Sequence, residues 1–191
     1  MKTILILAAG SSSRMGDRDK LLEQVQGVPL LTLMAQRALE TRAQVRVCLP
    51  GPDHPRVKAL PADARPVWVP DAAEGMGASI RTGVLSAART EALMILPADM
   101  PELTTNDLQT LWQAHTPDAI TRGASADGRP GHPVIFPQDL LRELETLRGD
   151  EGAKSVLVRH RQRLNLVPLP DQHALTDLDT PEAWANWRAK N

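Results

Sequence analysis

Short apolar runs alternate along the chain with segments whose apolar residues recur at helical spacing. The first run, Thr3–Ala8, is continuously apolar, which is the pattern of a strand covered on both faces. The other runs predicted as strands are Val45–Leu49, Pro66–Val69, Ala92–Leu96, Ala119–Thr121, Pro133–Phe136 and Leu164–Leu169. Most are short enough to be buried strands and too short to be independent helices.

Helices are predicted between these runs. Pro29–Leu39 has a proline in its first turn, and Met76–Arg89 places Ile80, Val84 and Ala87/Ala88 on one stripe. The other predicted helices run from Thr104/Thr105 to about His115, over Gln138–Leu147 and Glu151–His160, and over Glu182–Ala189 after Thr180 and Pro181.

The alternation of strands and helices predicts a single α/β domain over residues 1–191, with a mostly parallel sheet between two layers of helices. No repeat or linker divides the chain. In such sheets, ligands bind beyond the carboxyl ends of the strands. The residues that directly follow each buried strand are therefore the ones to examine for chemistry.

Composition narrows the classes of function. The 191 residues include 22 Lys and Arg and 23 Asp and Glu, so the chain lacks the excess of positive charge that is typical of nucleic-acid binding. One cysteine, Cys48, excludes an internal disulfide, and its apolar strand predicts a buried thiol rather than a nucleophile. No apolar run approaches the ~18 residues of a membrane span. The first run is too short for a signal peptide, so a cytoplasmic protein is expected.

The loop after the first strand carries the strongest candidate for phosphate binding. Ala8, Ala9, Gly10 and Ser11 are small, so the backbone there can approach a ligand and present its amide groups. Arg14 and Lys20 follow, and both cations suit a polyphosphate. The alternative is a serine-rich surface loop with incidental charges.

Two places carry carboxylates suited to a metal ion. Asp99 stands between Pro97 and Pro101 after a buried strand, and Mg²⁺ binds through one or two carboxylates plus phosphates. An aspartate that merely caps a turn is the alternative there. Asp177 and Asp179 are alternate residues of an extended segment, so both carboxylates can point the same way. The alternative is that they only stabilise the positive end of the following helix.

The sequence gives little independent support for a catalytic or metal-binding histidine. His132 lies in a glycine and proline turn, Arg129–Pro133, and a lone histidine there is usually structural. Neither a Gly-x-Ser-x-Gly elbow nor a His-Glu-x-x-His motif is present.

Taken in order, six motifs resemble the molybdenum cofactor nucleotidyltransferase family, and its cytidylyltransferase branch most closely. They are Leu7-Ala8-Ala9-Gly10 with Arg14-Met15-Gly16 and Lys20; Gly75-Met76-Gly77-Ala78-Ser79-Ile80-Arg81; Leu96-Pro97-Ala98-Asp99-Met100-Pro101; Arg129-Pro130-Gly131-His132-Pro133-Val134; Gly149-Asp150-Glu151-Gly152-Ala153-Lys154; and Asp177-Leu178-Asp179-Thr180-Pro181-Glu182. The resemblance spans nearly the whole chain.

The resemblance implies a Rossmann-like nucleotidyltransferase fold and a transfer reaction. The terminal phosphate of molybdopterin cofactor attacks the α-phosphorus of a nucleoside triphosphate, and pyrophosphate leaves. The resemblance further implies that Ala8 to Ser11 and Ser79 line the nucleotide and that Arg14 and Lys20 hold the phosphates. Asp99 and Asp177 are the implied Mg²⁺ ligands, with Asp179 as the competing second ligand. His132 and Asp150 are implied to face the acceptor. A cofactor-insertion chaperone or a recipient molybdoenzyme is an implied partner.

The resemblance favours CTP over GTP. Ala9 stands where the guanylyl branch carries a second glycine, and Gly75-Met76 replaces a Gly-Pro-Leu-type segment. Val69 and Ala72 depart from the Asn and Trp that often precede the second loop. Two alternatives remain open, namely transfer to a sugar or polyol phosphate and a non-catalytic cofactor-binding chaperone.

Overall fold

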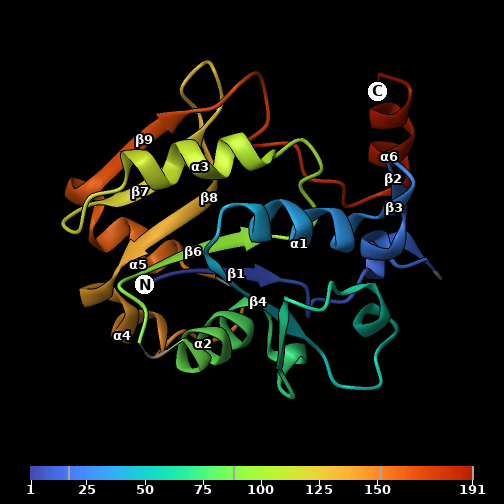
Figure 1. The fold of residues 1–191 in the computed structure, drawn as a ribbon, viewed down its shortest axis with the longest axis horizontal. Helices are drawn as coiled ribbons and strands as arrows, with labels where there is room; N and C mark the ends of the chain where they lie inside the picture. Colours follow the sequence, from blue (N-terminus) through green and yellow to red (C-terminus); the bar gives the residue numbers. More distant parts are fainter. Residues whose placement is uncertain (17, 88, 151, 191) are drawn as a thin grey trace.

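The computed structural model of the protein describes residues 1–16, 18–87, 89–150 and 152–190. Seven strands form the central sheet in the order β5-β4-β1-β6-β8-β7-β9 (Figure 1). Their bounds are Lys2–Leu7 for β1, Gln44–Leu49 for β4, Arg65–Trp68 for β5, Ala92–Pro97 for β6, Ile120–Ala124 for β7, Pro130–Pro137 for β8 and Leu164–Pro168 for β9.

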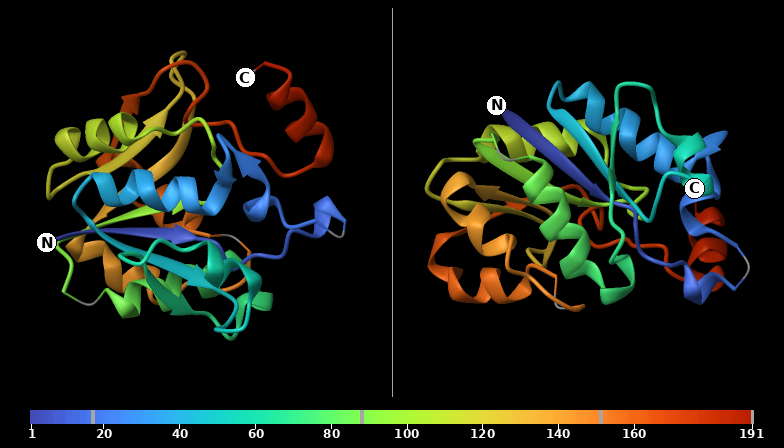
Figure 2. Two further views of the ribbon diagram at one scale, coloured as in Figure 1. Left: turned by 45° about the vertical axis from the view of Figure 1, so that its right-hand side comes forward. Right: turned by 90° about the horizontal axis from the view of Figure 1, so that it is seen from below.

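Helices cover both faces of this sheet (Figures 1 and 2). Apolar residues of α1 (Leu30–Glu40) and α3 (Thr105–Ala114) are buried with one set of sheet residues. Those of α2 (Met76–Ser86), α4 (Leu141–Leu144) and α5 (Lys154–Arg159) are buried with the other set. The expected single-domain α/β fold with helices on both faces of a mostly parallel sheet is therefore confirmed.

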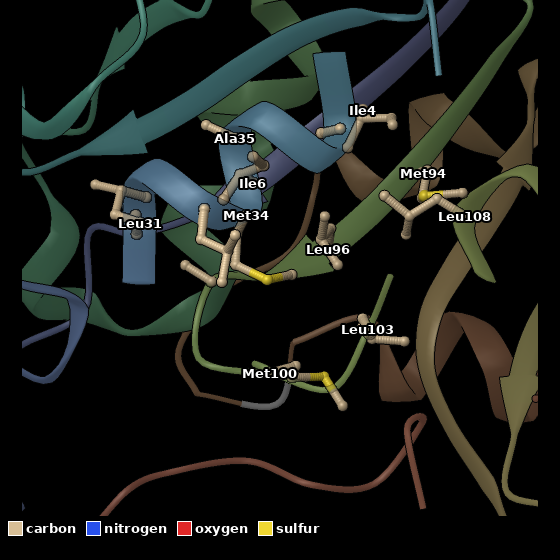
Figure 3. Close-up of a cluster of buried hydrophobic side chains, with 14 of the residues drawn as sticks. Ile4, Ile6, Leu31, Met34, Ala35, Met94, Leu96, Met100, Leu103 and Leu108 are labelled. Carbon is tan, nitrogen blue, oxygen red and sulfur yellow. The ribbon is translucent and has the colours of Figure 1, made fainter. Parts of the chain in front are cut away.

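Alternation along the strands supplies both halves of the core. Ile4 and Ile6 of β1 point to the α1 side, where they are buried with Met34 of that helix (Figure 3). Leu5, between them, points to the α2 side. Successive strand residues face opposite sides, so a continuous apolar run can fill two cores.

One strand breaks the parallel pattern. β8 runs antiparallel to both β6 and β7, with Ile95 opposite Val134. The N-terminal end of β8 therefore lies at the same edge of the sheet as the carboxyl end of β6. This direction brings His132 to that edge, and it places His132 inside a strand rather than in the turn expected from the sequence.

Several helices are shorter than predicted. α2 ends at Ser86, and α4 is a single turn that follows a 3-10 turn over Gln138–Leu140. α5 begins at Lys154, so Gly152 and Ala153 precede the helix. Ala88, expected on the stripe of α2, and Glu151, the expected start of the next helix, lie outside the described residues.

A small hairpin and the last helix complete the fold. β2 (Gln24–Val25) and β3 (Val28–Pro29), which the sequence did not predict, pair antiparallel before α1. α6 (Pro181–Arg188) is capped by the Thr180 hydroxyl, as expected, and lies near this hairpin (Figure 1). Arg188 of α6 pairs with Glu23 at 2.7 Å, and Trp184 is buried. Within the described residues, every helix is too short or too polar to cross a membrane.

Candidate functional site

The first loop, Ala8–Lys20, leaves the carboxyl end of β1 and contains most of the predicted phosphate ligands. Ala8 and Ala9 are buried, whereas Gly10 and Ser11 are exposed. The buried pair anchors the loop, since the Ala8 N–H donates to the Cys48 carbonyl at 3.1 Å. Gly10 and Ser11 are therefore the exposed small residues at the start of this loop.

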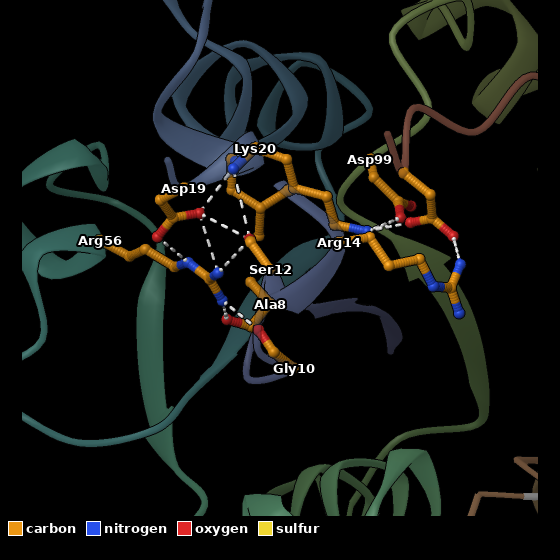
Figure 4. A network of polar contacts seen from close by, with 10 residues as sticks. Ala8, Gly10, Ser12, Arg14, Asp19, Lys20, Arg56 and Asp99 are labelled. Atoms are coloured by element: carbon orange, nitrogen blue, oxygen red, sulfur yellow. Dashed lines mark hydrogen bonds and ion pairs between the residues drawn. The ribbon is translucent and has the colours of Figure 1, made fainter. Parts of the chain in front are cut away.

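The two cations of this loop meet the predicted carboxylates. The Lys20 ammonium lies 2.6 Å from Asp99 Oδ2 and also contacts Asp179 Oδ1, while Arg14 Nη1 lies 2.6 Å from Asp179 Oδ2 (Figure 4). Burial opposes the charge on Lys20, but Asp99 and Asp179 outweigh it and raise the Lys20 pKa. The pKa of Asp179 is lowered, because the hydrogen bond and charge of Lys20 outweigh its burial.

The C-terminal segment reaches the site by crossing the end of β6. The Leu178 N–H donates to the Asp99 carbonyl at 3.1 Å, and Leu178 itself is buried. This contact fixes Asp177 and Asp179 beside Asp99. The sequence separates these residues by about eighty positions, so only the folded chain shows that they form one cluster.

Asp177 differs from Asp179 in its partners. Its pKa is raised by burial and by the negative charges of Asp179 and Asp99. Within the described part of the chain, no cation hydrogen-bonds to Asp177, and no group of three His, Cys, Asp or Glu residues forms a ready metal site. The oxygen donors nevertheless fit a divalent ion, since Mg²⁺ commonly takes only one or two carboxylates and completes its shell with phosphate and water.

His132 faces a cavity on the α2 side of the sheet. The backbone N–H of His132 donates to the Ala174 carbonyl at 2.8 Å. The buried ring nitrogen Nδ1 has no hydrogen-bond partner among the described residues. Burial and the neighbouring Arg122 lower its pKa to about 4, so the ring is neutral at pH 7. A buried ring nitrogen without a partner indicates a place for a ligand atom.

The cavity has a volume of about 520 Å³, within the range of small-molecule sites. Its walls are mostly apolar, and include Ile80, Ile95, Val134 and Phe136. Its polar lining residues are Arg122, His132, Lys154 and Arg161, with no carboxylate among the described residues that line it. The cavity therefore suits an anionic molecule with a largely apolar body.

The second motif, Gly75–Arg81, forms the start of α2 and packs against the segment that carries Asp150. The Gly77 N–H donates to the Gly149 carbonyl at 2.8 Å, and a Cβ on Gly75 would lie 2.0 Å from Asp150 Oδ1. The structure thus joins two motifs that were assigned to opposite substrates. Ser79, predicted to line the nucleotide, is buried in the first turn of α2, and Val69 is buried as well.

One residue of the site carried no recognisable signal in the sequence. Arg56 is buried, and its guanidinium binds both carboxylate oxygens of Asp19 and two carbonyls of the first loop (Figure 4). It lies in a polar stretch between strands and belongs to none of the six motifs. A single arginine in such a stretch usually lies in solvent, so its burial was the missing information.

Comparisons with known proteins show the family of the chain. The model of the MobA-like NTP transferase domain matches residues 4–164. Purine catabolism protein PucB of Bacillus subtilis is 30% identical, covering 94% of this chain and 92% of that protein. Molybdenum cofactor guanylyltransferase of Pseudomonas aeruginosa is 31% identical (97% and 94%), and molybdenum cofactor cytidylyltransferase of Escherichia coli is 25% identical (93% and 91%).

Solved structures share the fold. A nucleotidyl transferase from Methanothermobacter superposes with a TM-score of 0.84 at 22% identity, covering 100% of this chain and 97% of that one. A Mycobacterium tuberculosis protein solved as a manganese complex gives 0.80 at 23% identity, covering 97% and 96%. With the family model spanning most of the chain, the protein belongs to the MobA-like NTP transferase family and is a nucleotidyltransferase.

Proposed function

We propose that the protein transfers CMP from CTP to the terminal phosphate of molybdopterin cofactor and releases pyrophosphate. One observation carries the proposal: the Lys20 ammonium, at the end of the first loop, lies between Asp99 and Asp179, while Gly10 and Ser11 of the same loop are exposed. Cations, carboxylates and exposed backbone thus converge at the carboxyl edge of the sheet. That combination suits phosphoryl chemistry, which asks a protein mainly for positioning and charge neutralisation.

In this mechanism an oxygen of the acceptor phosphate attacks the α-phosphorus of CTP. A new P–O bond forms there, and the bond between the α-phosphorus and the bridging oxygen of pyrophosphate breaks, with the electron pair leaving on pyrophosphate. The acceptor phosphate is already ionised at neutral pH, so no side chain need remove a proton. Lys20 and Arg14 would neutralise the charge that develops on the leaving pyrophosphate.

Asp99 and Asp177 would hold Mg²⁺, with Asp179 left to Lys20 and Arg14. Burial and the negative charges of Asp179 and Asp99 raise the pKa of Asp177, and a bound cation would oppose this effect. A bound divalent ion would neutralise charge across the triphosphate and polarise the α-phosphate. Lys20 supplies the positive charge that pairs with Asp99 in this structure.

The cavity beside His132 supports an acceptor with a ring system. A planar ring can lay its faces against apolar side chains and keep its polar groups at its edge, whereas the hydroxyls of a sugar or polyol phosphate project in all directions and each needs a hydrogen-bond partner on burial. Apolar residues such as Ile80 and Phe136 offer none, whereas Arg122 and Lys154 suit a phosphate. His132 Nδ1 would bond to the ring edge of the acceptor.

Two motifs favour CTP over GTP as the substrate, namely the first loop and the segment that starts α2. Ala9 carries a methyl group into the core where a glycine would leave space, and Met76 lies exposed at the cavity. The named relatives include both a guanylyltransferase and a cytidylyltransferase. The cytoplasmic location and a downstream chaperone or molybdoenzyme partner belong to the same proposal.

Turnover with purified molybdopterin cofactor and each of the four triphosphates tests the proposal. With Mg²⁺ present, CTP should give pyrophosphate and the nucleotide-linked cofactor much faster than GTP or ATP. Equal or faster turnover with GTP would make the base assignment wrong and leave nucleotidyl transfer intact.

Two other outcomes would favour the alternatives. Triphosphate consumption with a sugar or polyol phosphate, and none with the cofactor, would favour the other acceptor class. Cofactor binding without pyrophosphate release under Mg²⁺ or Mn²⁺ would favour a non-catalytic chaperone.

A further inference from the structure

Arg56 lies beneath the first loop, in the 3-10 helix Pro55–Ala59, and its side chain is 3% exposed. Its Nε and Nη2 bond to Asp19 at 2.7 and 2.9 Å. Nη1 donates to the carbonyls of Ala8 and Gly10 at 2.6 and 2.8 Å, and Nη2 also reaches Ser12 Oγ at 3.0 Å (Figure 4). All three nitrogens of the rigid guanidinium therefore bond to residues of this loop.

These bonds fix the direction of two backbone N–H groups. In a trans peptide the carbonyl and the following N–H point in opposite directions. The Ala8 and Gly10 carbonyls both point at Arg56, and the cis bond found in the described residues is elsewhere. The N–H groups of Ala9 and Ser11 therefore each point away from Arg56. Neither has a hydrogen-bond partner within residues 1–16, 18–87, 89–150 and 152–190.

The same network holds the far end of the loop. Ser12 Oγ donates to Asp19 Oδ1 at 3.2 Å and accepts from the Lys20 backbone N–H at 3.3 Å. Asp19 also accepts from the Leu21 N–H at 3.0 Å. Arg56 is thus linked through Ser12 and Asp19 to the backbone of Lys20, whose side chain reaches Asp99.

We infer that Arg56 is a positioning residue for a polyphosphate. It orients the N–H groups of Ala9 and Ser11 as an anion cradle and ties that cradle to Lys20, without touching the ligand. Its charge is matched by Asp19, so its effect acts through the shape of the loop rather than through net charge. The inference rests on the proposed function only in assuming that the triphosphate binds at this loop.

The experiment uses inorganic tripolyphosphate with Mg²⁺, which has no base and needs no acceptor. In ¹⁵N spectra of the wild-type protein, its addition should shift the amide signals of Ala9 and Ser11. Arg56→Met should lose these shifts and bind tripolyphosphate and CTP about tenfold more weakly, the loss expected for one hydrogen bond to a charged group.

Arg56→Lys is the conservative variant. Its single ammonium retains a partner for Asp19, so the fold should be kept, but it cannot hold both carbonyls. Weakened binding with a normal circular dichroism spectrum is expected. Arg163→Met is the matched control, because Arg163 also bonds to a carboxylate, Asp139, and a backbone carbonyl, that of Asp118, away from this loop. Its polyphosphate affinity should equal that of the wild type.

Three results would overturn the inference. They are wild-type binding without a shift of the Ala9 and Ser11 amides, unchanged affinity in the Arg56 variants, and equal loss in Arg163→Met. All three leave the proposed function in place. A wild-type protein that binds neither tripolyphosphate nor any nucleoside triphosphate would instead contradict the proposed function itself.

Discussion

At the scale of single residues, charge at the site is arranged around Lys20. Its side chain is 16% exposed between Asp99 and Asp179, whereas the Arg14 side chain is 69% exposed. A cation shielded from water interacts more strongly with its partners than one in solvent. The two basic residues, which the sequence could only treat alike, are therefore expected to contribute unequally.

Lys20→Met should weaken CTP binding by about 1.5–3 kcal/mol, the range for hydrogen bonds to charged groups. Arg14→Met should cost about 1 kcal/mol or less because its partner contact is exposed. Isothermal titration with CTP and Mg²⁺ measures both. Lys20→Met should also bind Mn²⁺ more tightly than the wild type when no nucleotide is present, since the ammonium no longer neutralises Asp99. A larger loss of affinity in Arg14→Met would contradict this ranking.

The carboxylates give the second prediction at this scale. Asp99→Asn keeps the shape of the side chain but removes the charge that would bind the metal ion. The variant should fold normally, bind Mn²⁺ weakly and lose most of its turnover, with partial rescue by excess Mg²⁺. Asp177→Asn should lose more activity than Asp179→Asn if Asp177 is the second ligand. A folded Asp99→Asn protein with wild-type turnover would refute the metal assignment.

At the scale of elements, the site depends on how loops are packed between strands and helices. Gly75 directly precedes α2, and its φ of 115° is a backbone conformation that residues with a side chain rarely adopt. A Cβ added to Gly75 would collide with the Asp150 side chain. The start of α2 and the Asp150 segment therefore share one closely packed contact.

Gly75→Ala should lower the free energy of unfolding by about 1–3 kcal/mol, from backbone strain and from the displaced Asp150 segment. Gly51→Ala is the control, because no atom lies within 4 Å of its added Cβ and its φ is ordinary. Urea unfolding of both variants provides the measurement. Equal stabilities would show that the contact between Gly75 and Asp150 is looser than described.

At the scale of the whole molecule, acid should destabilise the fold in two stages. Burial and Arg122 lower the pKa of His132 from 6.5 to about 4, so the unfolded chain binds more protons than the folded one between these values. Stability from this group is present above pH 6.5 and is lost as pH falls toward 4. The loss is roughly 3 kcal/mol at most.

Below pH 3.8 the carboxylates add a second loss. Asp179 and Asp19 have lowered pKa values because their cationic partners outweigh their burial, so their contribution disappears as pH falls through the lowered values. Asp177, whose pKa is raised by burial and by Asp179 and Asp99, acts in the opposite direction and above pH 3.8, so it offsets part of the first stage. Chemical unfolding at a series of pH values tests this. His132→Gln should flatten the first stage and leave the second; an unchanged slope between pH 6.5 and 4 would contradict it.

Much of the architecture followed from local patterns. Thr3–Ala8 is apolar without interruption because both faces of β1 are covered. Thr104 and Thr180 start helices because their hydroxyls accept N–H groups of the first turn. The first loop and Asp99 could be proposed as site residues since they follow strands. Such features depend on neighbouring residues, which the sequence displays directly.

What the sequence determined by itself was therefore the fold class and the candidate ligands at the strand ends. Only the tertiary structure decided which way β8 runs, and so how His132 reaches the edge beside β6. Only folding placed Asp179 against Lys20, and Arg56 beneath Ala8 and Gly10. These contacts join residues dozens of positions apart, and their energies come from burial and charge pairing in space, which no local pattern along the chain records.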